Sequence, residues 1–429
     1  MVRLERGDVA AALGLLVFKL AVSAWVLHLG FSHVSDDDYA RVTIAQAFAH
    51  APRLDPSGTS WLPFPFWLNG LAMMGLGRTL AVARGVAIAT GVFGAWLVYG
   101  SLRASGVTRP VSWVSVALAM TAPWSAWLGV ATVPEALTAC LLVAGALSLN
   151  VRRHHGWGAA ALLVASLSRY EAWPVAAVFA AGCLWSARAP PRRARAVDLV
   201  AAGVSLLGPV AWVLWNAHAH GDPLHFLARV AAYRQRLGGA GTWMLYPRAM
   251  GEAAPEVALL ACFGGAAMLL DPTLRTRWAG PVAAVVALLT FLVLGELHDG
   301  APTHHPERAL VAVMWIATAC GVDGMVSLAR RVATPRIGGA VLVVGALAWG
   351  VLWTRRVADF PGQSPEDTRV TQVTLGESLR ARDVAYVVMT PCAYEHFAVI
   401  AAFGAPERVE VLSGSASVEK QACPRIEER

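Results

Sequence analysis

The sequence predicts an all-α polytopic membrane protein with a small α/β appendage at its C-terminal end. Of the 429 residues, 56% are hydrophobic and only 15% are charged, whereas soluble domains contain about 25% charged residues. The mean hydropathy is +0.53. Long apolar runs recur along most of the chain, separated by loops that contain arginine. These observations indicate many membrane spans in place of one soluble core.

We expect about eleven transmembrane helices, because about twenty apolar residues are needed to cross a bilayer. The first apolar run has no small-residue cleavage site after it, so it is predicted to be an anchor and not a signal peptide. The segments 157–170 and 172–187 are short and can form a broken pair. The predicted spans are 9–30, 80–102, 110–128, 134–150, 157–170, 172–187, 196–217, 255–270, 278–297, 307–328 and 337–354.

The arginines predict the orientation of the chain. The net charge is +7, and alternate loops contain arginines such as Arg103, Arg152 and Arg330. Since Lys and Arg concentrate in cytoplasmic loops, we expect the N-terminus in the cytoplasm and the first long loop on the periplasmic side, together with the C-terminal segment. The positive charge is expected to contact anionic membrane lipids. No nucleic-acid recognition motif is visible, so nucleic acid is not an expected partner.

The first outer loop contains three adjacent carboxylates, Asp36, Asp37 and Asp38, followed by Tyr39. Three consecutive side chains cannot all face one direction on a regular backbone. One or two of them can therefore line a site, where a carboxylate can act as a general base or bind a divalent cation such as Mg²⁺ or Mn²⁺. A solvated acidic loop explains the same spacing equally well.

Two segments of this loop are expected at the membrane surface. Residues 38–51 have apolar side chains at helical spacing but are too polar to span, which predicts an interfacial helix. The stretch 60–68 contains Pro63 and Pro65, which cannot both sit inside an ordinary helix. Trp61 and Trp67 suit the level of the lipid head groups. This stretch is predicted to be a kinked segment that dips into the membrane surface.

Other ionisable residues lie at the predicted outer ends of spans, where each has two interpretations. Glu135 follows Pro134 at a helix start, where the helix dipole favours a carboxylate, or it faces the same cavity as Asp36. Arg169 and Glu171 can pair with each other. Alternatively, Arg169 and Tyr170 can bind a phosphate group.

Arg308 begins the tenth predicted span, where it can hold a lipid-linked phosphate or extend its side chain to the interface. His304 and His305 precede it, but a histidine pair in a loop is more often not a metal site. The sequence contains no P-loop, nucleophile elbow, zinc-peptidase helix or dinucleotide fingerprint. This argues against ATP-driven transport and against the chemistry of soluble hydrolases.

The character of the sequence changes after residue 354. Residues 385–389 and 409–412 are predicted strands, and residues 371–382 a predicted helix. We therefore divide the chain into a transmembrane domain, 1–354, and a small periplasmic α/β domain, 355–429. If this domain is exported, a disulfide between Cys392 and Cys423 is plausible.

The order of these motifs resembles the GT-C class of integral-membrane glycosyltransferases, which includes protein O-mannosyltransferases and aminoarabinose transferases of lipid A. The resemblance covers about residues 9–354. It rests on an Asp-Asp-x-Tyr motif in a long first outer loop and a Trp-Leu-Pro-x-Pro-like segment. Three further motifs follow: a Pro-Glu at an outer helix start, a span that is interrupted by Arg-Tyr-Glu, and an outer loop that ends in His-Pro-Glu-Arg.

The resemblance implies a polyprenyl-phosphate sugar as donor and a lipid, glycan or protein acceptor, in the bacterial inner membrane with a periplasmic active site. Asp36, the first acid of the Asp-Asp-x-Tyr motif, would be the catalytic base, and Asp37 would support it. If the motif begins one residue later, Asp37 is its first acid instead. Glu135 would be the second acid, and a metal, where one is used, would bind to these three carboxylates. The residues that would face the donor phosphate are Arg169, Tyr170 and Arg308. The remaining cavity residues would be Tyr39, Trp61, Glu171 and His305.

A transporter or flippase of lipid-linked sugars is the main alternative. Such proteins also have many spans and buried charges, but they often contain internal repeats with matching broken helices. We find no such repeat between the halves of this chain. A scaffolding membrane protein is a third interpretation, although it would not need Arg169, Glu171 and Arg308 at membrane depth.

Overall fold

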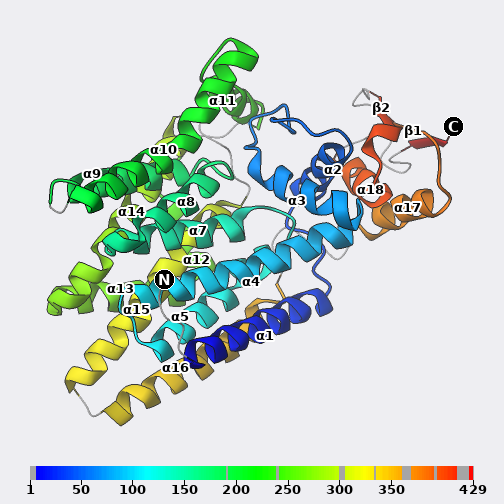
Figure 1. The fold of residues 1–429 in the computed structure, drawn as a ribbon. Coiled ribbons are helices and arrows are strands. Elements are labelled where there is room, and N and C mark those ends of the chain that lie inside the picture. Colours follow the sequence, from blue (N-terminus) through cyan, green and yellow to red (C-terminus); the bar gives the residue numbers. More distant parts are fainter. Residues whose placement is uncertain are drawn as a thin grey trace.

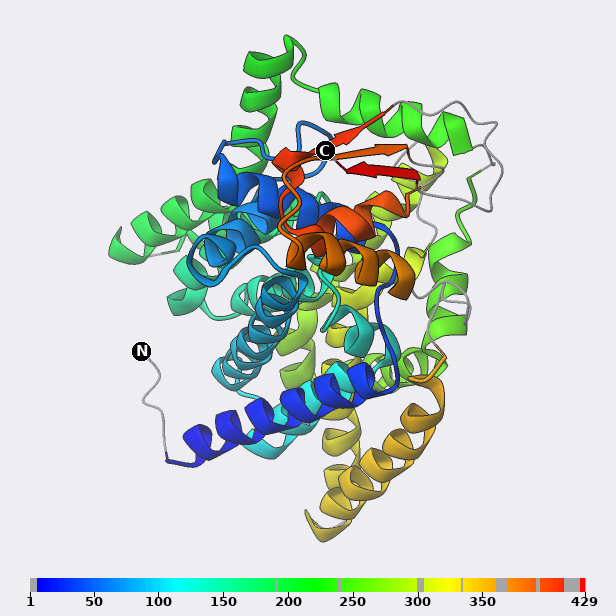
Figure 2. The ribbon, with the colours of Figure 1, turned by 90° about the vertical axis from the view of Figure 1, so that its right-hand side faces the viewer.

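The computed structural model describes residues 6–189, 192–237, 241–298, 305–332, 335–359, 369–390, 394–412 and 425–428. Within these ranges the chain is mostly helical, and its three short strands all lie in the C-terminal part. The helices form a bundle (Figure 1). Viewed from the side on which the chain ends, the C-terminal helices lie against the first loop (Figure 2).

Every predicted span contains a helix, so the predicted all-α membrane fold is confirmed. Pro123 begins a new helix inside the third span and divides it in two. The helices are α1 (Arg6–His28), α4 (Leu80–Ala104), α5 (Arg109–Thr121) with α6 (Pro123–Leu128), α7 (Glu135–Ser148), α8 (His155–Ser166), α9 (Ala172–Ser186), α10 (Arg192–His220), α13 (Pro255–Leu270), α14 (Pro272–Leu297), α15 (Val311–Val332) and α16 (Pro335–Arg356).

Not all of these helices are long enough to cross a bilayer alone. Among the described residues, five helices qualify by length and apolar composition, and a bent pair makes a sixth if it counts as one span. That pair is α12 (Leu245–Ala253) with α13, bent by 104°. A helix as short as α7, with 14 residues, is about 21 Å long, whereas the hydrocarbon core is about 30 Å thick. The number of spans judged by length is therefore smaller than the eleven that we expected.

Helix α15 lies at the centre of the bundle. In its most apolar window 89% of the residues are buried, compared with 28–33% for the other four long helices. Those four expose large apolar side chains such as Val17 on α1, Leu214 on α10 and Val286 on α14. Lipid tails are as apolar as leucine, so such exposure costs little in a bilayer. The chain is an integral membrane protein whose core surrounds α15.

The first loop contains two helices, α2 (Asp37–His50) and α3 (Phe64–Leu76). Helix α2 confirms the helix predicted for residues 38–51. The stretch with two prolines begins a helix and does not kink one, because Pro63 is the N-cap of α3 and Pro65 lies in its first turn. Proline is tolerated there since the first N–H groups of a helix have no partner within the helix.

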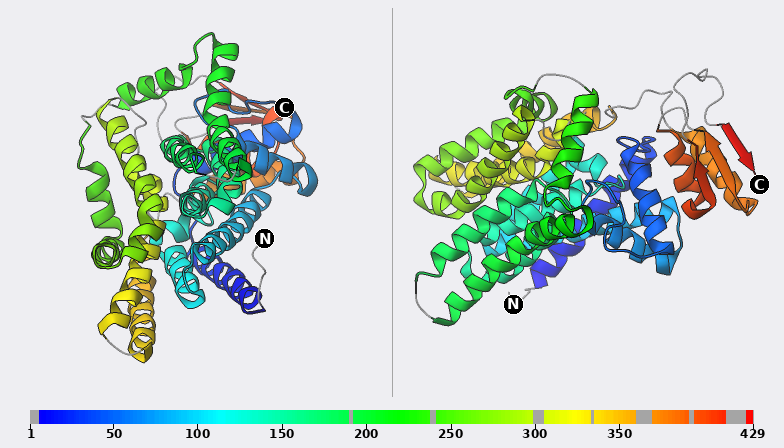
Figure 3. Two further views of the ribbon diagram at one scale, coloured as in Figure 1. Left: turned by 60° about the vertical axis from the view of Figure 1, so that its left-hand side comes forward. Right: turned by 90° about the horizontal axis from the view of Figure 1, so that it is seen from above.

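The C-terminal part consists of α17 (Val370–Ala381), β1 (Val387–Thr390), α18 (His396–Phe403), β2 (Val409–Val411) and β3 (Arg425–Glu428). The sheet order is β2-β1-β3, with β1 parallel to β2 and antiparallel to β3. The small α/β unit is thus confirmed, although β3 was not predicted. Cys392 and Cys423 lie outside the described residues. Seen from above, this part lies at one end of the molecule, next to α2 and α3 (Figure 3).

The C-terminal part docks on the first loop through specific contacts. Gln46 on α2 donates a hydrogen bond of 2.7 Å to the backbone oxygen of Ala401 on α18. Arg78, which precedes α4, forms a bidentate ion pair with Glu407, with distances of 2.7 and 2.8 Å. Apolar residues of α2 and α18 also share one buried cluster.

Asp198 is a buried carboxylate near the C-terminal end of α7, and it connects three helical segments. Asp198 on α10 has no exposed side-chain surface and contacts Arg152 Nη2 at 2.6 Å and His155 Nδ1 at 2.8 Å. These partners belong to the short helix η1 (Arg152–His154) and to α8. Removing one member of a buried ion pair leaves an uncompensated charge.

Asp198→Asn is therefore expected to destabilise the detergent-purified protein by about 3–5 kcal/mol, measured as a lower melting temperature. Glu252→Gln is the matched control, because it removes an exposed carboxylate that pairs with Arg248 four residues earlier. We expect the control to melt like the wild type. Equal melting temperatures for the two variants would contradict the structural role of Asp198.

Candidate active site

The three adjacent carboxylates at the start of α2 have different partners. Asp38 is only 2% exposed. Its Oδ2 accepts hydrogen bonds from the backbone N–H groups of Val34 and Ser35, and its Oδ1 accepts one from the N–H of Thr132 at 2.9 Å. Thr132 precedes α7, so Asp38 joins the first loop to the bundle. Both of its oxygens are used in this structural role.

Asp36 faces the C-terminal part. Its two oxygens accept hydrogen bonds from Nε and Nη2 of Arg369 at 2.9 and 3.0 Å. Asp36 is the N-cap residue of α2, yet its side chain makes no capping hydrogen bond. The carboxylate that the GT-C resemblance favours as the base is therefore held in a bidentate ion pair.

Asp37 is the most accessible of the three. Its side chain is 44% exposed, compared with 24% for that of Asp36. Its Oδ2 lies 3.5 Å from Nη1 of Arg308. A carboxylate with this exposure can approach a ligand from outside while it remains next to a buried cation.

Glu135 lies at the centre of the ionic cluster. It is the first residue of α7 and is 2% exposed. Its Oε1 accepts hydrogen bonds from Arg169 Nη1 at 2.5 Å and from Arg308 Nη2 and Nε at 2.6 and 2.9 Å. Its Oε2 is buried and has no hydrogen-bond partner among the described residues. One oxygen of Glu135 thus accepts hydrogen bonds from two arginines that are far apart in the sequence, Arg169 and Arg308.

Arg169 is shared between two acids. It lies between α8 and α9, and besides Glu135 it contacts Glu171, whose two oxygens are both 3.1 Å from its Nε. Burial lowers the pKa of Arg169, but Glu171 and Glu135 more than offset this effect and raise the pKa above its usual value. Arg169 is therefore a permanent cation. The ion pair between Arg169 and Glu171 that one interpretation predicted is present. The phosphate-binding interpretation of Arg169 and Tyr170 stays a prediction.

A third arginine, Arg41, completes the cluster, and it was not predicted. Its guanidinium lies 4.3 Å from the centre of the Trp61 ring. Burial lowers its pKa to about 10, although Glu135 and Asp37 act in the opposite direction. Arg41 therefore stays protonated at neutral pH. Its position four residues after Asp37 on one helix face is a signal that the sequence contained.

The other predicted cavity residues lie at the border of the cluster or outside it. Tyr170 donates a hydrogen bond of 2.6 Å to the backbone oxygen of Ser60 and accepts one from Trp212, so its hydroxyl fastens the first loop. Burial raises its pKa. Tyr39 is buried in the cluster between α2 and α18. The His305 ring packs 5.4 Å from that of Trp124, and His304 lies outside the described residues.

The three carboxylates proposed as metal ligands do not fit a shared divalent cation. Asp36 faces Arg369, Glu135 faces Arg169 and Arg308, and Asp37 faces Arg308. A metal ion would lie against guanidinium groups that already balance these acids. Among the described residues, no group of three or more His, Cys, Asp or Glu is arranged to hold a metal ion.

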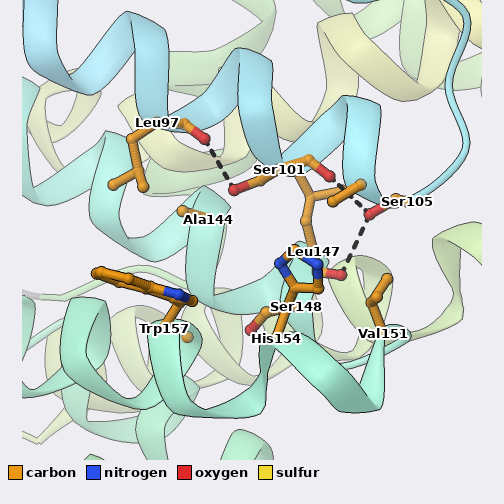
Figure 4. Close-up of a pocket in the computed structure, with 11 residues that line it drawn as sticks. Leu97, Ser101, Ser105, Ala144, Leu147, Ser148, Val151, His154 and Trp157 are labelled. Atoms are coloured by element: carbon orange, nitrogen blue, oxygen red, sulfur yellow. Dashed lines mark hydrogen bonds between the residues drawn. The ribbon is translucent and has the colours of Figure 1, made fainter. Parts of the chain in front are cut away.

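A separate small cleft lies between α4, α7 and α8 (Figure 4). Its volume is about 30 Å³, and Ser101, Ser148, His154 and Trp157 line it. Ser148 is the last residue of α7, whereas Glu135 is the first. The cleft is therefore at the opposite end of α7 from the ionic cluster and is not part of the candidate site.

Melting temperatures can test which of the adjacent acids at the start of α2 has a structural role. Asp38→Asn is expected to lower the melting temperature, because hydrogen bonds to a charged acceptor contribute about 1.5–3 kcal/mol each. Asp37→Asn is expected to leave the melting temperature unchanged, since its carboxylate is the most exposed of the three. If Asp37→Asn destabilised the protein as much as Asp38→Asn, the assignment of Asp38 as the structural acid would fail.

No protein-family model matches the sequence, and no curated protein matches it. Among solved structures, the chain is similar to ArnT from Cupriavidus metallidurans in the apo state, with a TM-score of 0.53 and 16% sequence identity. The alignment covers 92% of this chain and 76% of the ArnT chain. At this identity the likeness establishes the fold, and the activity must be argued from the site. The helical membrane fold that the sequence predicted is confirmed, and the chain shares the fold of this ArnT structure.

Proposed function

We propose that this protein is a membrane glycosyltransferase that moves a sugar from a polyprenyl-phosphate donor to an acceptor hydroxyl group. The observation that carries the proposal is the cluster in which Glu135 Oε1 holds both Arg169 and Arg308, with Asp37 beside Arg308. An accessible carboxylate and two cations thus lie together next to the start of α7. The fold shared with ArnT supports the same class of reaction.

The cluster contains the two kinds of group that the reaction requires. The acceptor hydroxyl gives its proton to a carboxylate, which acts as a general base. Its oxygen forms a bond to the anomeric carbon of the sugar, and the bond from that carbon to the phosphate oxygen breaks. Polyprenyl phosphate leaves with the bonding electrons, so fixed cations stabilise the charge that develops on the phosphate. Arg308 and Arg169 are the cations of this cluster, and Glu135 holds them in place.

Asp37 is the carboxylate that we assign as the base. Asp36 is engaged by both of its oxygens with Arg369, and Asp38 is engaged with three backbone N–H groups. The side chain of Asp37 is more exposed than that of Asp36 and next to Arg308. Asp36, the first choice from the sequence, becomes the second candidate on this geometry.

The surroundings of the cluster agree with a lipid-linked donor. The apolar tail of such a donor remains in the bilayer while its phosphate reaches the ends of the helices. The donor, the periplasmic side, the inner membrane and a lipid, glycan or protein acceptor all belong to this proposal. The positions of the arginines under the positive-inside rule support the periplasmic side, and the resemblance of the sequence to the GT-C class supports the donor and the acceptor.

The proposal predicts transfer from a radiolabelled donor in proteoliposomes. The probes are polyprenyl phosphates that contain mannose or aminoarabinose, offered with lipid, glycan and peptide acceptors. Loss of label from the donor with release of polyprenyl phosphate supports the proposal. If the intact lipid-linked sugar crosses the bilayer without cleavage, the protein is a transporter and the proposal fails.

For the base, Asp37→Asn is expected to lower kcat by about 10²–10⁴-fold, the usual contribution of general base catalysis. Glu252→Gln is the control, because it removes an exposed acid on α12 that forms an ion pair with Arg248. If Asp36→Asn abolishes transfer while Asp37→Asn retains it, the base is Asp36, as the sequence motif implied.

For the leaving group, Arg308→Gln is expected to lower kcat by about 10²–10³-fold, as the removal of one donor to a developing oxyanion does elsewhere. The affinity for polyprenyl phosphate alone, measured by titration calorimetry, should also fall. Arg331→Gln at the other end of α15 is the matched control, since Arg331 pairs with Asp271 far from the cluster. Unchanged affinity in Arg308→Gln would contradict the phosphate role.

A further inference from the structure

We propose that Arg369, a residue of the C-terminal part, is a positioning residue for the base. It holds Asp36 and thereby orients the neighbouring Asp37 toward Arg308. This inference rests on the proposed function, because it concerns the same site. It gives the C-terminal α/β part a direct role in the reaction, although no atom of that part contacts the reacting groups in this scheme.

The contact between Arg369 and Asp36 is geometrically specific. Two N–H groups of Arg369 reach the two oxygens of Asp36 at 2.9 and 3.0 Å. Bidentate arginine–carboxylate pairs fix orientation as well as distance. The two side chains are only 15% and 24% exposed, so water screens them little. A mobile surface pair would not show this combination.

The unused N-cap position of α2 supports the same conclusion. An aspartate at an N-cap usually accepts a hydrogen bond from a backbone N–H in the first turn of its helix. Asp36 is the N-cap of α2 but makes no such bond: its backbone is in the helical region, and its carboxylate is paired with Arg369. The next residue, Asp37, is the first of the helix. Fixing the Asp36 side chain therefore fixes the backbone from which Asp37 projects.

The backbone of Arg369 is held in an unfavourable conformation. Its φ and ψ are 56° and 15°, in the left-handed region. Among the described residues, Arg369 and Asp383 are the only ones other than glycine that have a positive φ. Such conformations persist where the surrounding structure determines them, and they concentrate at functional sites. Arg369 directly precedes α17, which packs on α18, and α18 packs on α2.

Arg369 is not the only residue that attaches the C-terminal part to the rest of the protein. A second bidentate ion pair, Arg78–Glu407, joins the same two parts. Gln46 adds a buried hydrogen bond to Ala401, and an apolar cluster adds further contact. Arg78 does not contact the acids at the start of α2. The chain thus contains its own matched control for docking without positioning.

The experiment compares Arg369→Gln and Arg369→Lys with the control Arg78→Gln in the full-length protein. The first measurement is hydrogen exchange of the backbone amides of residues 36–42, which requires no substrate. We expect faster exchange there in Arg369→Gln, partial recovery in Arg369→Lys, and wild-type exchange in Arg78→Gln. The melting temperature of each variant shows whether it is folded, and Arg369→Lys keeps the comparison possible if Arg369→Gln is not.

The second measurement is transfer from polyprenyl-phosphate mannose, or from aminoarabinose if that donor is the one consumed. In Arg369→Gln we expect kcat to fall about 100-fold, the effect of a small misplacement of a reacting group, with KM and the affinity for polyprenyl phosphate unchanged. Weaker binding of polyprenyl phosphate would overturn the proposal, because Arg369 would then be a phosphate ligand. Equal losses in Arg78→Gln and Arg369→Gln would also overturn it, since docking alone would explain both.

The two proposals can fail separately. Unchanged hydrogen exchange at the start of α2 in both Arg369 variants overturns the positioning role, whatever the chain catalyses. Absence of donor consumption by the wild-type protein overturns the proposed function, while the exchange measurement still decides whether Arg369 holds α2. Loss of transfer in Asp36→Asn but not in Asp37→Asn overturns the positioning role alone, because Asp36 would then be the base itself, while the transfer activity stands.

Discussion

The site depends on the buried contact between one oxygen of Glu135 and two arginines, Arg169 and Arg308. Buried charges are costly unless they are paired and hydrogen-bonded, and an apolar bundle offers few other partners. The three residues come from the start of α7, the connection of α8 to α9, and the turn before α15. Their contact therefore fixes the ends of these helices relative to one another. It also keeps two cations at the place where the first loop enters the bundle.

The first loop supplies the remaining groups, and its geometry follows from the different partners of its acids. Asp38 is bound to the backbone before α7, and Asp36 is bound to the C-terminal part. Asp37, between them, is left more exposed and beside Arg308. Two of the carboxylates thus have both oxygens engaged by structural partners, and the third remains accessible. The stacking of Arg41 on Trp61 adds a positive charge from the same helix.

The short helices explain how a polar cluster can exist in so apolar a chain. Helices α7, α8 and α9 are too short to cross a bilayer alone, and their ends lie where Glu135, Arg169 and Glu171 gather. The backbone groups at a helix end lack partners within the helix. Charged side chains and irregular backbone at membrane depth are tolerated where protein surrounds them. The long helices other than α15, in contrast, expose apolar faces.

The sequence by itself determined the membrane class, the helical segments and the residues Glu135, Arg169 and Arg308, because composition and apolar periodicity are local properties. It could not decide between Asp36, Asp37 and Asp38, since their spacing is the same for every assignment. Only the tertiary structure distinguishes their partners, which lie as far along the chain as Thr132 and Arg369. Helix lengths and the contact of the C-terminal part with α2 were likewise settled by packing. Contacts between distant segments leave no periodic signal in a single sequence.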